Sequence, residues 1–526
     1  MPRRIPRLLW LVIPLAYILY FHGLGAFGLL GPDEPRYASI GREMARSGDW
    51  VTPRLWGQPW FEKPALLYWM TGAAFRLGLG TSLAPRLPVA MMAVAFLGFY
   101  WWIVRREFGS YVAWLATLIL GTSGMWLGFS QVGVTDLPLA ATFSAAMLLA
   151  LPWAARRDAR FLPAAGAMLG LAVLAKGLTP LVLAAPVLPV AWFARRSTKS
   201  LTAEAPGRGE ERRLAWLLGV GALAMRVIAP FLAVALPWYL LCSMRNGSAF
   251  LTDFFWRQHF LRFTSGALMH GQPWWYYLPV FAAAFLPWTP LLVLSVRGAP
   301  RWDVRRLLLL AWVAFGLIFF SLSVNKLAGY ILPLLPAAAL LAALALAEAA
   351  GAGMWLAACA LLLAALPMAG AVLPAALVSG LSQAPWPVFQ WVWLAPAAMA
   401  AAAWALEKRG RRLAAVAAIA AGAGASMLYV KQTALPEVDR AASARGLWLQ
   451  VAPHAGETCV DTLQRDWRYG LNYYSVTPLP DCAAQPRPLR VRQLPGRPPF
   501  PTAASPPAMV DPLTPGVVIS RSEPMP

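Results

Sequence analysis

The amino-acid sequence predicts an all-α polytopic membrane protein, with about thirteen transmembrane helices followed by a small extracytoplasmic α/β domain. Its 526 residues are 59% hydrophobic and only 13% charged, and the mean hydropathy is +0.56. A soluble domain carries about 25% charged residues. Long apolar runs between short polar breaks indicate the helical class, and the polar segment that follows Lys431 indicates the second domain.

The transmembrane helices are predicted from apolar runs of about 18 to 20 residues, long enough to cross a hydrocarbon core of about 30 Å. The first run lacks the small-residue cleavage site of a signal peptide, so we interpret it as a span. The predicted spans are 8–30, 84–103, 111–129, 135–153, 161–176, 178–194, 214–241, 274–296, 307–323, 328–348, 353–377, 386–406 and 413–431.

The basic residues predict the orientation, because Lys and Arg are retained on the cytoplasmic side. They cluster at residues 3–7, 105–106, 156–160, 195–213, 297–306 and 408–412, which fall on one side of the predicted spans. The N-terminus is therefore expected in the cytoplasm, and loops 31–82, 242–273 and 324–329 on the extracytoplasmic face. The net charge of +22 would also suit a nucleic-acid partner, but its placement in short loops beside spans favours topology.

The chain is expected to divide into a transmembrane domain, residues 1–431, and a periplasmic domain, residues 432–526, with a Pro-rich tail. Segments 456–463, 469–476 and 488–494 are predicted as strands, after a helix over 437–452. The tail beyond Leu494 is too rich in proline for regular structure. Cys459 and Cys482 lie in this outer domain, where an oxidising compartment permits a disulfide bond without requiring one.

The loop 31–82 combines acids, bases and aromatic residues in an otherwise membrane-like sequence, and it is the predicted site of chemistry. Asp33 and Glu34 follow the first span directly, and either carboxylate could act as a general base toward an acceptor. The alternative is a helix N-cap at Asp33, before Pro35 in the first turn. Lys63 is suited to bind a phosphate as a point charge, although it could instead pair with Glu62.

Two later loops on the same predicted face repeat this combination of cations and aromatic residues. The first carries Arg257, His259, Arg262 and His270, and the second carries Lys326 and Tyr330. Several cations around one extracytoplasmic pocket indicate an anionic ligand that is attached to lipid or carbohydrate. Lys176, at the end of a predicted span, is interpreted as an interfacial anchor.

These blocks together resemble the polyprenyl-phosphate-dependent membrane glycosyltransferases of the aminoarabinose lipid A transferase and protein O-mannosyltransferase superfamily. The resemblance covers about the first two-thirds of the chain. Ala65 and Ala328 replace prolines that are usual there, without removing a charge. The resembling blocks are DEPRYASIGREMARSGDWVTPRLWGQPWFEKPALLYW from Asp33, APRLPVA at 84–90, VTDLPLA at 134–140, AKGLTP at 175–180, FWRQHFLRFTS with HGQPWWYYLP at 255–279, and NKLAGYILPLLP at 325–336.

The resemblance implies a GT-C fold and an inverting glycosyltransferase that uses a sugar linked to undecaprenyl phosphate. Asp33, with Glu34 beside it, matches the catalytic acidic position of the family, and four further residues complete the expected substrate pocket: Arg36, Tyr37, Glu62 and Tyr68. The residues expected to bind the donor phosphate are Lys63, Arg257, Arg262, Lys326 and Tyr330. Cations there would stabilise the charge that develops on the leaving phosphate.

The expected partners are the undecaprenyl-phosphate-linked sugar, the acceptor and membrane lipids, and the protein is placed in the bacterial inner membrane. The first interpretation is transfer of an aminosugar such as 4-amino-4-deoxy-L-arabinose to a lipid A phosphate. The alternatives are transfer to protein or O-antigen acceptors and, from another class, transport of the lipid-linked sugar without chemistry. No cofactor is required, but a divalent metal held by Glu62 and His259 is allowed, since some relatives hold one there.

Overall fold

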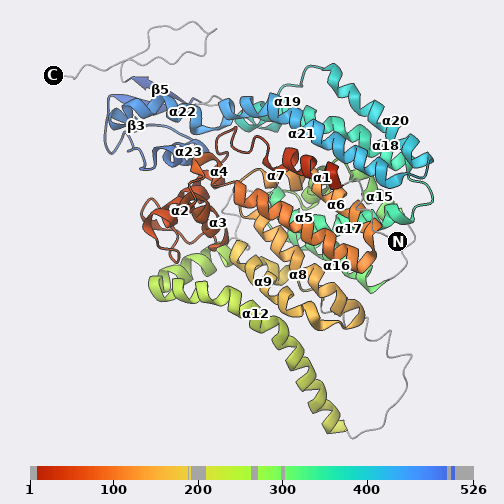
Figure 1. The fold of residues 1–526 in the computed structure, drawn as a ribbon. Helices are drawn as coiled ribbons and strands as arrows, with labels where there is room; N and C mark the ends of the chain where they lie inside the picture. The colour runs from red at the N-terminus through yellow and green to blue at the C-terminus, as the bar shows by residue number, and fades with distance from the viewer. Residues whose placement is uncertain are drawn as a thin grey trace, which may run out of the picture.

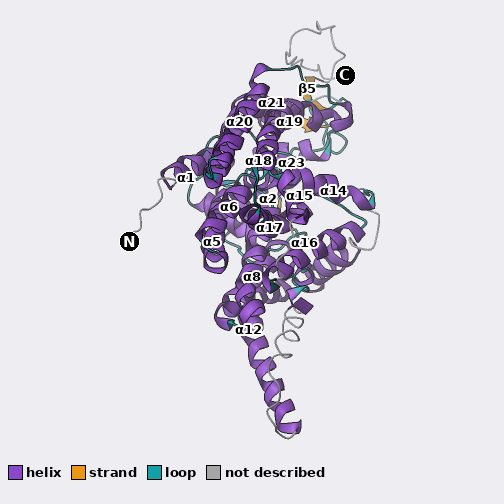
Figure 2. Ribbon diagram, turned by 90° about the vertical axis from the view of Figure 1, so that its right-hand side faces the viewer, coloured by secondary structure: helices purple, strands orange, loops and turns teal. Residues whose placement is uncertain are grey.

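The computed structural model describes residues 9–187, 189–190, 209–261, 271–297, 303–494 and 499–503. A bundle of apolar helices forms the body, and α12 projects from it as a long arm (Figures 1 and 2). The main helices of the body are α1 (Leu9–Ala16), α5 (Leu87–Phe108), α6 (Ser110–Gly121), α7 (Gly124–Ser130), α8 (Asp136–Arg156), α9 (Leu162–Lys176), α10 (Thr179–Leu183), α12 (Gly209–Leu251), α14 (Tyr277–Ala284), α15 (Thr289–Arg297), α16 (Val304–Leu322), α17 (Leu335–Glu348), α18 (Gly353–Leu361), α19 (Ala365–Ser379), α20 (Ala395–Lys408) and α21 (Arg412–Ala442).

The protein is a polytopic helical membrane protein, as predicted, with a span count that differs from the prediction. Within the described residues, eight helices are long and apolar enough to cross a membrane, or up to ten if two bent pairs count as spans. The pair α6 and α7 bends by 62°, and the second pair, which includes α14 and α15, bends by 113°. The predicted first span, 8–30, is shorter than expected, because helix geometry ends at Phe21. The count of thirteen stays a prediction.

Sequence-distant basic residues meet at one end of the bundle, as their distribution predicts. The Glu107 carboxylate at the end of α5 accepts hydrogen bonds from both terminal nitrogens of Arg156 at 2.6 and 2.7 Å. Arg305, at the start of α16, donates to the Glu107 backbone carbonyl. Because α5, α8 and α16 contain 22, 21 and 19 residues, each reaches about 30 Å away from this basic end at about 1.5 Å per residue.

The segment 31–82 was predicted as a loop, but it folds into two packed helices and a hairpin. Helix α2 (Asp33–Ser47) lies against α3 (Leu66–Arg76), and β1 (Arg54–Leu55) pairs with β2 (Gln58–Pro59) between them; a short helix, α4 (Gly80–Leu83), follows. A Cβ at Gly41 would lie 2.8 Å from the Thr71 side chain, so glycine permits this close helix approach. The polar residues of the segment are therefore held on a rigid support.

The C-terminal domain is a small α/β unit, with one predicted strand corrected to a helix. Strands β3 (Thr458–Val460) and β4 (Leu489–Arg492) pair in parallel, and β5 (Phe500–Ala503) pairs antiparallel with β4. Residues 465–475 form α23 (Arg465–Ser475), not a strand, because the buried residues Trp467, Gly470 and Leu471 follow the i, i+3, i+4 spacing of one helical face. Helix α22 (Ala444–Val451) precedes the sheet. Strand β5 lies in the tail expected to lack regular structure.

A disulfide bond joins Cys459 and Cys482, whose Cα atoms lie 5.0 Å apart. Helix α23 of this domain lies beside α2 (Figure 1). The Tyr473 hydroxyl donates to the Thr81 backbone carbonyl at 2.6 Å, and the Trp56 ring stacks on Tyr469 with centroids 5.6 Å apart. The C-terminal domain therefore forms one wall around the polar segment 31–82.

Candidate active site

A cavity of about 400 Å³ lies at the end of the bundle opposite the basic end. The start of α2, the start of α8, the end of α9 and the end of α16 contribute to its walls. Its polar and aromatic lining combines three carboxylates with two lysines: Asp33, Tyr37, Glu62, Lys63, Phe129, Thr135, Asp136, Lys176, Thr179, Phe319, Phe320, Ser323, Asn325 and Tyr330. Such a mixture of charged and aromatic groups suits a phosphorylated sugar.

Asp33 faces this cavity from the first turn of α2. Its side chain is 49% exposed and forms an ion pair with the buried guanidinium of Arg36, which lies one turn along the helix. Arg36 also reaches the Glu62 carboxylate at 3.0 Å. The N-cap position belongs to Pro32 and shows no side-chain capping bond. The alternative of an N-cap at Asp33 is therefore wrong, and the carboxylate remains accessible from the cavity.

Glu34 differs from Asp33 in its surroundings, which do not support a catalytic role. Its side chain is 1% exposed and pairs with Arg86 through distances of 2.6 and 2.8 Å. The backbone N–H groups of Leu30 and Gly133 donate to the same carboxylate at 2.9 and 2.8 Å. Neighbouring residues of a helix point about 100° apart, so Asp33 faces the cavity while Glu34 faces the core. Glu34 therefore joins segments of the fold.

Two lysines reach the cavity, and each is paired with a carboxylate. The Lys63 amine lies 3.0 Å from Glu62, and the Lys176 amine lies 2.6 Å from Asp136. Lys176 also lies over the Tyr330 ring, 5.0 Å from its centroid. The interpretation of Lys176 as an interfacial anchor is wrong, and Asp136 was not selected from the sequence. The signal was a single carboxylate before an apolar helix, which is costly unless it is paired.

The remaining residues predicted to bind phosphate separate into three groups. Tyr330 lines the cavity. Lys326 does not, because its buried amine donates to the backbone carbonyls of Ser323 and Gln272. Arg257 is exposed and pairs with Asp253 at 3.7 Å, outside the cavity lining. Arg262 and the side chain of His259 lie outside the described residues. The predictions for Lys326 and Arg257 are corrected accordingly.

The predicted pocket residues near Asp33 form two layers. Tyr37 and Glu62 line the cavity, whereas Arg36 and Tyr68 lie behind them. The rings of Tyr37 and Tyr68 lie 5.9 Å apart, and burial raises the pKa of both phenols well above the usual value. Both therefore stay protonated near neutral pH and keep hydroxyl donors beside the carboxylates.

Of the two residues suggested for a divalent metal, Glu62 is already engaged by two cations, and the side chain of His259 lies outside the described residues. The two oxygens of Glu62 face cations, the Lys63 amine at 3.0 Å and the Arg36 guanidinium at 3.0 Å. Among the described residues, no group of three or more His, Cys, Asp or Glu side chains could hold a metal ion. A metal ion at Glu62 would be a third positive charge there and would be repelled by both Lys63 and Arg36.

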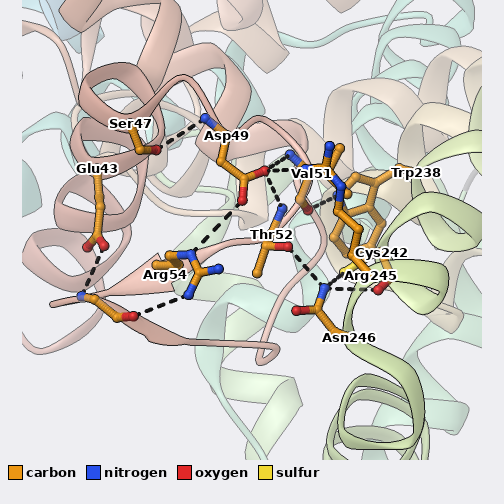
Figure 3. A network of polar contacts seen from close by, with 11 residues as sticks. Glu43, Ser47, Asp49, Val51, Thr52, Arg54, Trp238, Cys242, Arg245 and Asn246 are labelled. Carbon is orange, nitrogen blue, oxygen red and sulfur yellow. Dashed lines mark hydrogen bonds and ion pairs between the residues drawn. The ribbon is translucent and has the colours of Figure 1, made fainter.

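A network of polar contacts connects the segment 31–82 to helix α12 (Figure 3). The Asp49 carboxylate accepts hydrogen bonds from the backbone of Val51 and Thr52 at 3.0 and 3.1 Å and from Arg245 at 2.9 Å. Asn246 donates to the Thr52 hydroxyl at 3.0 Å. These bonds connect the turn after α2 with α12, nearly 200 residues away in sequence. The position of α2, and hence of Asp33, thus depends on a distant helix.

Comparison with protein families and curated proteins identifies related membrane transferases. Residues 6–246 match the family model described as dolichyl-phosphate-mannose-protein mannosyltransferase. The chain is 36% identical over 350 residues to undecaprenyl phosphate-alpha-4-amino-4-deoxy-L-arabinose arabinosyl transferase 1 of Sodalis glossinidius, covering 64% of this chain and 58% of that protein. It is also 36% identical over 345 residues to the corresponding transferase of Pseudomonas aeruginosa, covering 62% and 57%. The chain thus matches less than two-thirds of the length of these relatives.

The structural comparison extends over more of the chain. The crystal structure of ArnT from Cupriavidus metallidurans bound to undecaprenyl phosphate superposes with a TM-score of 0.71 and 28% sequence identity, covering 92% of both chains. The apo structure of the same protein gives a TM-score of 0.69 at 27% identity, again covering 92% of both. The structural similarity therefore extends well beyond residues 6–246, which the family model matches.

Proposed function

We propose that this chain, which belongs to the superfamily of polyprenyl-phosphate-dependent GT-C glycosyltransferases, transfers a sugar from undecaprenyl phosphate to a phosphate of lipid A. The proposed sugar is an aminosugar such as 4-amino-4-deoxy-L-arabinose, because the names of the relatives include this sugar. The observation that carries the proposal is the cavity in which accessible Asp33 lies with Lys63 and Lys176. The two lysines can bind the phosphate of the donor, while the accessible carboxylate of Asp33 can face the sugar.

The two lysines are proposed to hold the donor phosphate. When the bond between the anomeric carbon and the phosphate oxygen breaks, its electron pair goes to the leaving polyprenyl phosphate. Ammonium groups at that oxygen stabilise the charge as it develops, which is where electrostatic catalysis is most effective. Because Lys63 and Lys176 are already paired with Glu62 and Asp136, their amines are held in place before the donor binds.

Asp33 is proposed to act on the acceptor. An acceptor phosphate oxygen is already anionic, so it attacks the anomeric carbon from the face opposite the leaving group without losing a proton, and the configuration inverts. In that case Asp33 orients the acceptor before the attack and stabilises positive charge on the sugar ring during it. If the acceptor were a hydroxyl group of protein or O-antigen, the same carboxylate would take its proton as general base.

The aromatic residues of the cavity are proposed to hold the sugar. Tyr37, Phe319, Phe320 and Tyr330 contribute apolar ring faces to the lining. Sugar rings carry apolar C–H faces that pack on such rings, while the hydroxyl and amino groups reach the carboxylates nearby. This arrangement supports a sugar-sized ligand between the cations and Asp33.

The orientation of the protein is part of the proposal. The cavity and the disulfide-bonded domain are assigned to the periplasm, and the N-terminus and the basic end to the cytoplasm of an inner-membrane protein. The bond between Cys459 and Cys482 supports this assignment, since disulfides persist in oxidising compartments. The gathering of Arg156 and Arg305 at the opposite end supports it as well. The division into domains 1–431 and 432–526 remains proposed.

The test is mass spectrometry of lipid A from cells that lack the native gene and express either wild type or Asp33→Asn. We expect a sugar-sized adduct on a lipid A phosphate with wild type and its loss with Asp33→Asn. The matched control is Asp158→Asn, which removes a carboxylate at the basic end and should leave the adduct unchanged. Unmodified lipid A in cells whose membranes contain the wild-type protein would refute the lipid A acceptor and favour protein or O-antigen acceptors.

A further inference from the structure

A second cavity, of about 280 Å³, lies between the C-terminal half of α2 and the C-terminal domain. The proposed transfer reaction does not use it. Helix α2, the hairpin turn and the segment after α23 each contribute to its lining, which consists of Ser39, Arg42, Glu43, Arg46, Trp56, Gly57, Val476, Thr477 and Pro478. Two arginines and one glutamate give this lining a net positive charge.

Arg42 is the most informative residue of this cavity. It is only 6% exposed, yet its guanidinium forms no hydrogen bond or ion pair with the described part of the chain. The guanidinium carbon lies over the Tyr473 ring, 4.5 Å from its centroid. Burial lowers the pKa of Arg42, and the charge of Arg46 acts in the same direction, against the opposing effects of Tyr473 and Glu43. A buried cation without a counter-ion is costly, and an anion in the cavity would remove that cost.

The nearby carboxylate does not supply the missing partner. Glu43 accepts a hydrogen bond from the backbone N–H of Gly57 at 2.9 Å, which turns it toward the hairpin (Figure 3). Arg46 lies four residues after Arg42, so both guanidinium groups project from one face of α2. Part of the charge of Arg46 is balanced by the C-terminal end of the helix dipole. Arg42 lies a turn earlier, where that effect has faded.

The walls of the cavity are held in unusual backbone conformations. Among the described residues, three non-glycine residues have positive φ, and two of them line this cavity: Trp56 at 53° and Val476 at 68°. A positive φ is costly for a bulky or β-branched side chain and persists only where the surrounding structure enforces it. Stacking of Trp56 on Tyr469 provides such support. The cavity is therefore preformed rather than a gap between mobile loops.

We propose that this second cavity is an anion-binding site for a phosphate group, either a phosphate monoester on a glycolipid headgroup or inorganic phosphate. Two guanidinium groups can bind phosphate oxygens through paired N–H donors. Arg42 lies five residues after Tyr37, which lines the first cavity, so the two sites are separated by about 7.5 Å along α2. The site is distinct from the one assigned to transfer, and binding there does not require transfer to occur.

The experiment measures phosphate binding to the full-length protein in detergent by equilibrium dialysis. One probe is radiolabelled inorganic phosphate, and the other is glucosamine 1-phosphate, with glucosamine as the comparison that lacks the phosphate. Arg42→Gln and Arg46→Gln are compared with wild type. The matched control is Arg492→Gln, which removes an arginine paired with Asp461 at 3.0 Å on the same C-terminal domain.

Because the first cavity also contains cations, two quantities are measured: the number of phosphates bound per chain and the affinity of each class of binding site. We expect Arg42→Gln and Arg46→Gln to lose one class of site or weaken it at least tenfold, and Arg492→Gln to bind as wild type does. Arg42→Lys, which keeps the charge, should recover part of the binding, and this recovery separates a lost ligand from a lost fold.

The two probes distinguish the sources of phosphate. Affinity at least tenfold higher for glucosamine 1-phosphate assigns the site to a phosphorylated headgroup, whereas equal or higher affinity for inorganic phosphate assigns it to the free ion. The proposal is overturned if wild type and both glutamine variants bind the same number of phosphates with the same affinity. That result would leave the transfer reaction unaffected, since lipid A modification is measured independently.

Discussion

Replacement of Lys176 by methionine tests the assignment of the donor phosphate most directly. The side chain is 15% exposed, so an effective dielectric constant of about 20 is appropriate, and a phosphate oxygen about 4 Å away would interact by about 4 kcal/mol. The Asp136 carboxylate, 2.6 Å from the Lys176 amine, already neutralises part of the lysine charge. We therefore expect a net loss of about 2 to 3 kcal/mol of transition-state stabilisation, or about 30-fold to 150-fold in rate.

The assay is the initial rate of sugar transfer by purified protein, with thermal unfolding measured on the same samples. Lys326→Met is the matched control, because its amine donates to backbone carbonyls rather than to the cavity. It should lower thermal stability while the rate per folded molecule stays within about threefold of wild type. A folded Lys176→Met variant that transfers sugar at the wild-type rate would refute the phosphate assignment, as would a large rate loss in folded Lys326→Met.

Three further predictions concern the carboxylates and the disulfide. Glu34→Gln should destabilise the fold by about 3 to 5 kcal/mol, because it leaves the fully buried Arg86 unpaired. A thermal melt in detergent measures this loss. Recovery of stability in Glu34→Gln/Arg86→Met would show that the unpaired arginine causes it. Asp33→Asn should lose transfer with little change in melting temperature, since its side chain is half exposed; a large stability loss would instead make Asp33 structural. Removing the disulfide with Cys459→Ser and Cys482→Ser should cost about 3 kcal/mol, because the bond closes a loop across 23 residues; unchanged protease resistance of the C-terminal domain would contradict this.

Apolar run length and charge placement were sufficient to predict the class of fold and the end where basic residues gather. They could not predict how helices pair, which is why the segment 31–82 was expected to be a loop. This segment has fewer apolar residues than the predicted spans, and they form a buried face only when α2 and α3 pack together. The aromatic run at 469–476 was likewise read as a strand, although the spacing of Trp467 and Leu471 is helical.

For the site, the sequence identified the residues that face the cavity when they lie in a dense polar segment, as Asp33 and Lys63 do. The sequence did not predict the role of a lysine when that role depends on its partner in the folded protein. Lys326 and Lys176 are both single lysines in apolar surroundings, yet one amine meets backbone carbonyls and the other meets Asp136 across 40 residues. Nothing local distinguishes the two. The difference arises from which helix ends meet, and that is a property of the packed bundle.

The position of the cavity also separates a transferase from a transporter. A transporter needs ionisable groups near the middle of the membrane and a polar path to both faces. Helix α8 begins with Asp136 at the cavity and ends with Arg156 at the basic end, and no ionisable residue lies between them along its 21 residues. Almost all of its residues between these two ends are buried in the bundle. A charged substrate bound beside Asp136 therefore meets closely packed apolar side chains along α8 in the direction of the other face, and this favours chemistry at one surface over passage through the membrane.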